Sequence, residues 1–204
     1  QDAAALVIPG PNKDLDNREI KLLNEYLEKD GKLLILLNPD PTESWKQLLS
    51  EWRIDVPAGT LIDPASHVAP NLDHPLVPRN QNRFGFTEVY FAGAAGLIPQ
   101  KGLPESVKIQ PLTWTSRKSW IEKDFTSGEE PQFDKLKDQP GPFAIGAMIN
   151  KGGTSIVVFG DSHFATDKHF YNGNNSDLFL NTINQLAAEA EVISVDRKVI
   201  PARR

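Results

Sequence analysis

The feature that most restricts the fold is an unbroken apolar stretch, "KLLILLNPD", at residues 32–40. A strand with one face in water alternates apolar and polar residues, whereas here apolar residues follow one another directly. The stretch therefore predicts a strand in a sheet that is covered on both faces. Gly31 precedes it, in a position suited to a left-handed cap on a preceding helix.

The segment before this strand predicts a parallel β–α–β unit. The run "ALVIPGP" is apolar until Pro and Gly end it, and a stretch with apolar residues at helical spacing follows. Asp16, with Glu19 three residues later, has the spacing of a capping box. We expect strands at about 5–9 and 32–37 to be parallel neighbours, joined by a helix at about 17–29 through a right-handed crossover.

The rest of the chain continues the α/β pattern with one irregular region. The expected elements are a helix over Thr42–Trp52, an irregular β-containing insertion around 57–140, strands in "PFAIGAMIN" and "TSIVVFG", a helix with Ser176 as N-cap, and a last strand at "VISV". The "KGG" between the two strands predicts a tight hairpin turn. Together these elements predict a three-layer α/β sandwich with a mostly parallel sheet, as a single domain over residues 1–204.

Composition narrows the classes of function. With no cysteine among 204 residues, the chain has no disulfide, thiolate metal site or cysteine nucleophile. The net charge of −5 is dispersed and no basic stripe with interleaved aromatics occurs, so we expect no nucleic-acid partner. No apolar stretch is long enough to span a membrane. The abrupt ends of the sequence lead us to expect a fragment of a longer, membrane-anchored protein.

The candidate site consists of polar residues that follow the predicted strands. In an open parallel α/β sheet, ligands bind beyond the carboxyl ends of the strands, where such loops converge. The candidates for a ligand or interaction loop are Asn12, Asn38, Asp40, Asp161, Ser162 and His163. The same residue types are also the usual ones for turning a chain and capping a helix, which is the more economical interpretation.

Three kinds of chemistry are poorly supported at these loops. A serine hydrolase elbow needs G-x-S-x-G, but Phe164 stands where the second glycine belongs. Asp161, His163, Asp167 and His169 are close in sequence without a diagnostic metal-ligand spacing. Neither a dinucleotide nor a P-loop glycine motif occurs, so we expect no cofactor and no metal.

Trp114 and Trp120 flank "TSRKS" and would suit stacking on a sugar, or a place in the core.

Three blocks of the sequence resemble a known family. These are "ALVIPGPNKDLDNREIKLLNEYLEKDGKLLILLNPD", "LTWTSRKSWIEKD" and "VVFGDSHFATD … NGNNSDLFLNTINQLAAEAEVISV". In this order they resemble the auxiliary components of ABC-type transport systems associated with gliding motility. Asp30, Asp167 and Gln185 depart from the family pattern, which often has Gly, Asn and Trp there.

The resemblance implies a fold like the class I glutamine amidotransferases, a flavodoxin-like sandwich, without their Cys-His chemistry. It also implies an extracytoplasmic (periplasmic) domain, anchored by transmembrane helices outside this sequence, with the membrane and ATPase subunits of the transporter as partners. It carries over Gly160, Asp161, Ser162 and Phe164, but not His163.

We therefore expect a non-catalytic domain that acts in protein interaction or ligand binding. In this hypothesis Asp161 accepts backbone N–H bonds and Ser162 caps a short helix. Two alternatives stay open: a hydrolase or carbohydrate-processing enzyme that uses Asp161, Ser162 and His163, and a small-molecule sensor that uses a strand-end pocket with Trp114 or Trp120.

Overall fold

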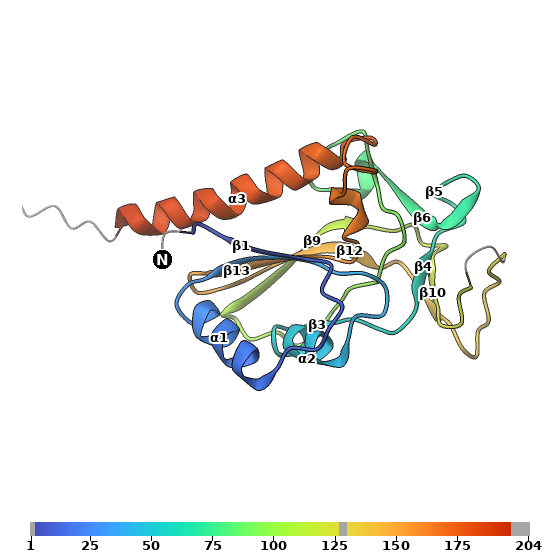
Figure 1. The fold of residues 1–204 in the computed structure, drawn as a ribbon. Coiled ribbons are helices and arrows are strands. Elements are labelled where there is room, and N and C mark those ends of the chain that lie inside the picture. The colour runs from blue at the N-terminus through green and yellow to red at the C-terminus, as the bar shows by residue number, and fades with distance from the viewer. Residues whose placement is uncertain (1–2, 127–129, 197–204) are drawn as a thin grey trace, which may run out of the picture.

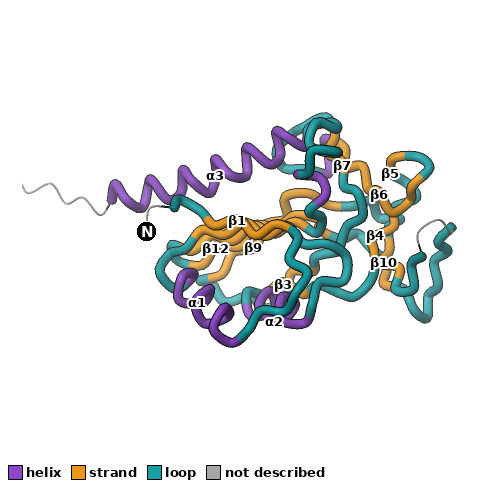
Figure 2. Tube along the Cα trace, in the orientation of Figure 1, coloured by secondary structure: helices purple, strands orange, loops and turns teal. Residues whose placement is uncertain are grey.

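A computed structural model describes residues 3–126 and 130–196 of the chain. Its centre is a five-stranded sheet in the order β1-β2-β13-β12-β9. The strands are β1 (Leu6–Pro9), β2 (Lys32–Leu36), β13 (Thr154–Phe159), β12 (Ala144–Lys151) and β9 (Val107–Trp114). Helices α1 (Asn17–Leu27) and α2 (Glu43–Glu51) lie on one face, and α3 (Asn175–Asp196) lies on the other (Figures 1 and 2).

The predicted β–α–β unit is present. β1 pairs in parallel with β2, and β2 pairs in parallel with β13. α1 begins with the expected capping box, in which the Asp16 carboxylate accepts from Glu19 N and the Glu19 carboxylate accepts from Asp16 N. Leu36 in β2 is 2% exposed, as expected for a strand covered on both faces.

The sheet is mixed rather than mostly parallel. β12 pairs antiparallel with both of its neighbours, β13 and β9, so only two of the four pairings are parallel. The hairpin turn predicted at "KGG" joins β12 to β13. Such a local hairpin can only be antiparallel, which explains the mixture.

The region expected as an irregular insertion contains one strand of the main sheet, β9, at its edge. The rest of it forms three small antiparallel sheets, one of which begins just before residue 57. Their strands and one 3-10 turn are β3 (Ile54–Asp55), β4 (Thr60–Ile62), β5 (His67–Val68), β6 (Asn71–Pro78), η1 (Arg79–Gln81), β7 (Glu88–Tyr90), β8 (Ile98–Pro99), β10 (Trp120–Glu122) and β11 (Gln139–Pro140). The predicted β-containing region is thus present, except that one of its strands belongs to the main sheet.

Two apolar cores lie on opposite faces of the main sheet. Leu33 and Ile35 of β2 pack with α1 and α2, whereas Leu34 and Leu36 pack with Leu178 and other residues from the α3 side. Alternate residues of one strand therefore serve both cores, as period-2 geometry requires. Among the described residues, no helix combines the length and the hydropathy needed to cross a bilayer.

Three local predictions were wrong. The left-handed residue before β2 is Asp30, with φ 61°, and not Gly31. α3 begins at Asn175, so Ser176 lies inside the helix instead of capping it. "VISV" continues α3 and forms no strand, because the preceding "LAAEAE" consists of strong helix formers.

Candidate functional site

The loops that follow β1, β2 and β13 meet beyond the carboxyl ends of these strands, as predicted. The Ser162 hydroxyl donates to Asn38 Oδ1 over 2.7 Å, and Ser162 N is 3.3 Å from the same oxygen. A Cβ placed on Gly10 would lie 3.1 Å from Ser162 Oγ. The three loops are thus in contact, and Asn38 and Ser162 link two of them.

Two other predicted site residues do not join this junction. Asn12 is exposed, and its side chain makes no hydrogen bond with the described part of the chain. Asp40 accepts from Gly59 N over 2.7 Å, so its carboxylate holds the segment before β4. The candidate site is therefore smaller than expected.

Asp161 is completely buried, and backbone groups surround its carboxylate. Oδ2 accepts from Ala92 N (2.8 Å) and Phe164 N (3.2 Å), and Oδ1 accepts from His163 N (2.7 Å). The predicted bonds to its own loop are present. The bond to Ala92 was not foreseen, and it fastens the loop after β13 to the segment after β7.

Gly160 is required by a close approach rather than by a sharp turn. A Cβ on Gly160 would collide with the carbonyl oxygen of Ala95. Ala95 N donates to Gly160 O over 2.8 Å, so the two backbones lie directly against each other. The same segment that bonds Asp161 thus also bonds Gly160.

Ser162 has a different partner from the one predicted, and His163 has a partner that was not predicted. The short 3-10 helix η2 (His163–Ala165) has no side-chain cap bond, because the Ser162 hydroxyl bonds Asn38 instead. His163 Nδ1 is 3.1 Å from Asp161 Oδ1, and the His163 side chain is 50% exposed. The bond with Asp161 raises the pKa of His163, against the opposing effect of partial burial.

This arrangement holds loops together and does not activate a nucleophile. The partner of the Ser162 hydroxyl is an amide oxygen, which cannot act as a general base at neutral pH. His163 is paired with Asp161 instead. Within the described ranges, no three His, Cys, Asp or Glu side chains are grouped so that they could hold a metal ion.

A second group of titratable side chains was missed by sequence reasoning. His74 lies in β6, with Nδ1 3.0 Å from the Tyr90 hydroxyl. The Tyr90 ring packs 5.2 Å from the ring of His169, which is 9% exposed. Burial lowers the pKa of His169 and raises the pKa of Tyr90, and the charge of Asp161 raises the pKa of Tyr90 further. These shifts favour the neutral forms of His169 and Tyr90, whose rings pack against each other beside the Asp161 loop.

The two tryptophans considered for stacking have different environments. Trp120 is buried, with Nε1 donating to Glu122 Oε2 over 3.1 Å. Trp114 is half-buried and lines a groove of about 780 Å³. This groove is rich in proline and apolar residues, with Arg83 and Gln139 as longer polar side chains; its lining includes Pro99, Pro111, Pro140, Pro142 and Phe143.

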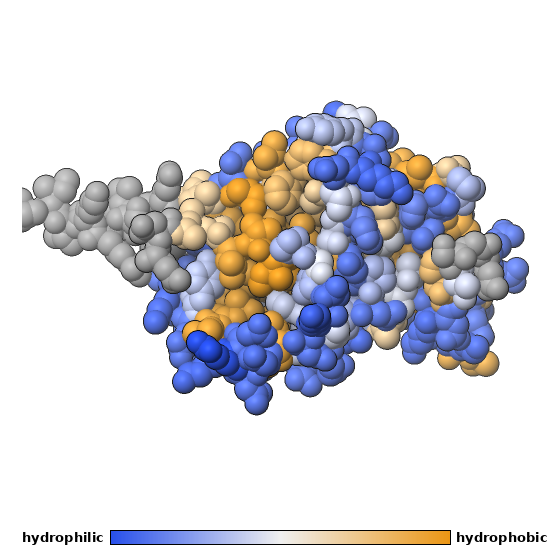
Figure 3. All heavy atoms as spheres, viewed as in Figure 1, coloured by the Kyte–Doolittle hydropathy of each residue, from blue (hydrophilic) through white to orange (hydrophobic). Residues whose placement is uncertain are grey.

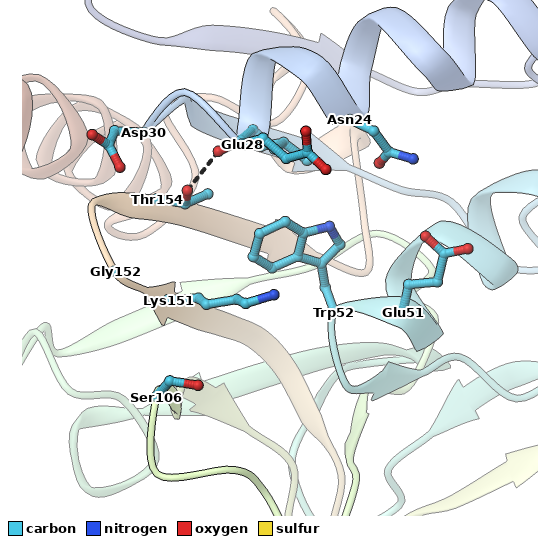
Figure 4. Close-up of a pocket in the computed structure, with 10 residues that line it drawn as sticks. Asn24, Glu28, Asp30, Glu51, Trp52, Ser106, Lys151, Gly152 and Thr154 are labelled. Atoms are coloured by element: carbon cyan, nitrogen blue, oxygen red, sulfur yellow. Dashed lines mark hydrogen bonds between the residues drawn. The ribbon is translucent and has the colours of Figure 1, made fainter.

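A pocket of about 560 Å³ lies at the opposite end of the sheet from the strand-end loops (Figure 4). It is bounded by the ends of α1 and α2 and by the turn between β12 and β13. Figure 4 shows the indole of Trp52 in the middle, with Asn24 and Glu28 on one side and Lys151 on the other. A smaller cavity of about 190 Å³ adjoins it and shares Trp52, Glu51 and Lys151. Sequence reasoning gave Trp52 only as the end of a helix and so missed this pocket.

Comparisons with known proteins show a similarity in fold only. No family model matches the chain, and no curated protein matches it significantly. Nine chains of solved structures are similar. One, described as "mmIFT52 N-terminal domain", has a TM-score of 0.62 and 18% identity over 89% of this chain and 76% of that chain. Another, the exo-β-1,4-mannosidase Op5Man5 from Opitutaceae bacterium strain TAV5, has a TM-score of 0.39 and 12% identity over 92% of this chain and 24% of that chain. The chain therefore has an α/β fold similar to that of the mmIFT52 N-terminal domain.

Proposed function

We propose that this chain is a non-catalytic interaction or binding domain in the extracytoplasmic part of an ABC-type transport system. The observation that carries the non-catalytic role is the use of the strand-end polar groups. The Asp161 carboxylate is occupied by three backbone N–H groups, and the Ser162 hydroxyl is occupied by Asn38. An enzyme would need this carboxylate and this hydroxyl free for chemistry, whereas here both groups hold loops in place.

The transport assignment rests on the three sequence blocks described above. They support a flavodoxin-like, glutamine-amidotransferase-like fold, a periplasmic location and an anchor of transmembrane helices outside this sequence. The partners in this proposal are the membrane and ATPase subunits of the transporter. The likeness to the mmIFT52 N-terminal domain agrees with an α/β fold, and it does not bear on the location, the anchor or the partners.

The edge strand β1 is the surface that we assign to the interaction. Strands at the edge of a sheet carry unpaired backbone groups that another chain can use. Figure 3 shows hydrophobic surface in a band between α3 and α1, along β1. Leu6 of β1, Leu22 of α1 and Leu180 of α3 are 41%, 54% and 51% exposed. Such an apolar band on an open edge suits a protein contact.

The test is co-purification of the full-length protein from its own membrane after mild crosslinking. We expect transporter membrane and ATPase subunits to be enriched. Leu6→Lys should reduce this enrichment, whereas Leu136→Lys, at a site that is 96% exposed in the 130–142 segment, should leave it unchanged. Enrichment of no transporter subunit would refute the assignment.

The enzyme alternative has its own test. The chain is screened against generic ester, peptide and glycoside substrates, and we expect no turnover. Turnover that Ser162→Ala abolishes would overturn the non-catalytic role.

A ligand-sensing role is a second candidate, and the groove beside Trp114 favours it. Its volume of about 780 Å³ and its apolar lining are typical of small-molecule sites. Thermal melting in the presence of a metabolite library tests this role, and any stabilising ligand should lose its effect in Trp114→Ala.

A further inference from the structure

The pocket around Trp52 has a strong electrostatic imbalance. α1 and α2 both end at this pocket, and the carboxyl end of a helix carries a partial negative charge. Basic residues commonly compensate such ends, yet neither helix has one in its last turn. Glutamates are found there instead, Glu28 as the C-cap of α1 and Glu51 as the last residue of α2.

These glutamates are not neutralised within the protein. In the described part of the chain, neither the Glu28 nor the Glu51 side chain has a hydrogen bond or an ion pair. Two of the nearby cations are engaged elsewhere: Lys32 Nζ donates to Gly153 O over 2.7 Å, and the Arg53 guanidinium is 3.4 Å from Gln100 Oε1. Lys29, which follows Glu28, is exposed and forms no ion pair with either glutamate in the described structure. Two helix ends and two free carboxylates thus converge on one cavity.

The ammonium group of Lys151 lies in the pocket, against the Trp52 ring. It is the one cation among the described residues that line the pocket, and its Nζ lies 5.3 Å from the centre of the Trp52 ring. An ammonium at this distance interacts favourably with the negative face of an indole. Lys151 makes no ion pair with Glu28 or Glu51 in the described structure, so the carboxylates remain available. The protein's own lysine therefore occupies part of a cation site and leaves its acidic part open.

We propose that this pocket binds an organic cation, a guanidinium or ammonium group carried by a ligand. The cation would lie against Trp52 and form charge-assisted hydrogen bonds with Glu28 and Glu51. Trp52 Nε1, which has no acceptor among the described residues, and the Asn24 amide are available for polar atoms of the same ligand. The acidic lining rejects anions, and a neutral ligand would leave the carboxylates without a counter-charge.

This inference extends the binding role proposed above but is independent of the transport assignment. A failed co-purification leaves the pocket untouched, and a failed titration leaves the β1 edge untouched.

The first experiment compares two ligands of almost equal shape on the wild-type chain. Both ligands are used with the α-amino group acetylated, so that L-argininamide carries the guanidinium as its one charge and L-citrullinamide, with a neutral urea in its place, carries none. Binding is followed by the indole N–H signals of the four tryptophans in ¹H–¹⁵N spectra, with Trp52 assigned from Trp52→Phe. We expect L-argininamide to shift the Trp52 signal saturably and L-citrullinamide to leave it in place. An unmoved Trp52 signal, or equal shifts with both ligands, would overturn the proposal.

Charge-removing variants test the acidic wall. Glu28→Gln and Glu51→Gln should each raise the Kd for L-argininamide about 2- to 5-fold, as expected for partly exposed ion pairs. Glu25→Gln is the matched control on α1, because Glu25 is exposed, lies 3.9 Å from Lys21 and does not line the pocket. A Kd that both pocket variants leave unchanged counts against the site.

Lys151 gives a test with the opposite sign. Because Lys151 competes for the indole and repels a second cation, Lys151→Met should lower the Kd about 2- to 5-fold. Lys118→Met, at an exposed lysine outside the pocket, should have no effect. Weaker binding by Lys151→Met would contradict the proposal, since it would make Lys151 a ligand contact rather than a competitor.

The source of the cation is distinguished by two further probes. Agmatine represents a free amine metabolite, and a blocked Gly-Arg-Gly peptide represents an arginine of a partner protein. Tighter binding of agmatine assigns the site to a metabolite, and tighter binding of the peptide assigns it to a protein partner. Binding of neither would overturn the proposal.

Discussion

Replacing Asp161 with alanine should destabilise the fold by about 2 to 6 kcal/mol. The carboxylate serves three backbone donors, and their exposure decides the cost of losing it. Phe164 N–H is buried, so leaving it without an acceptor costs about 1 to 3 kcal/mol. The N–H groups of Ala92 and His163 are only partly buried, so water compensates in part and each loss costs about 0.5 to 1.5 kcal/mol.

The measurement is urea unfolding followed by tryptophan fluorescence, with the free energy of unfolding taken from the midpoint and slope. Asp167→Ala is the matched control, because Asp167 lies in the same loop, is exposed and has no partner in the described chain. We expect the control to remain within about 0.5 kcal/mol of wild type. An unchanged midpoint for Asp161→Ala at an unchanged slope would refute the structural role of Asp161. An activity lost in the same variant would then point to chemistry.

Three further predictions concern stability. Leu36→Ala should cost about 2 to 5 kcal/mol in urea unfolding because Leu36 is 2% exposed in β2; a small loss would indicate a strand that can collapse around the cavity. The bond to Asp161 raises the pKa of His163, so this pair stabilises fully below the ordinary histidine pKa of about 6.5 and less as the pH rises through the raised pKa. The stability difference between wild type and His163→Ala should therefore shrink from about pH 6 to about pH 9, and a difference that grows would reverse the assigned sign. Glu28→Gln and Glu51→Gln should each raise the free energy of unfolding by about 0.3 to 1 kcal/mol in thermal melts, because each removes a negative charge from a helix carboxyl end; a loss of stability would show that the glutamate supports the fold.

The parts of the fold that depend on neighbours in sequence could be predicted. The capping box of Asp16 and Glu19 involves residues three positions apart, and the hairpin between β12 and β13 closes over a two-residue turn. The consecutive apolar residues of β2 indicated that both faces of the sheet are covered there, whichever elements cover them. These patterns carry their structural consequence with them.

Errors arose where tertiary packing or a neighbouring residue decided the outcome. Gly31 is of the residue type that left-handed caps favour, which led to the wrong prediction. A Cβ on Gly31 would lie 2.5 Å from Tyr26 O, so a glycine is needed there because the two backbones approach closely. Asp30 adopts the left-handed conformation, which Asp tolerates better than most residues. The family resemblance, with Gly common at position 30, contained this signal.

The candidate site was only partly visible in the sequence. The convergence of the loops at Gly10, Asn38 and Ser162 follows from parallel strand order, which the β–α–β pattern gives. The bond between Asp161 and Ala92 spans 69 positions and leaves no trace in local sequence. The pocket at Trp52 depends on two helices ending side by side, which only the assembled fold provides.

The parallel pairing of β2 with β13 has a consequence for how the chain folds. It brings together residues 123 positions apart, as between Lys32 and Ser155. The β12–β13 hairpin and the β1–α1–β2 unit are each local in sequence, and a hairpin or a helix such as α1 forms in microseconds, whereas closing a long chain segment carries a large entropic cost. We therefore expect the rate-limiting step of folding to be the docking of these two preformed units along the β2–β13 seam.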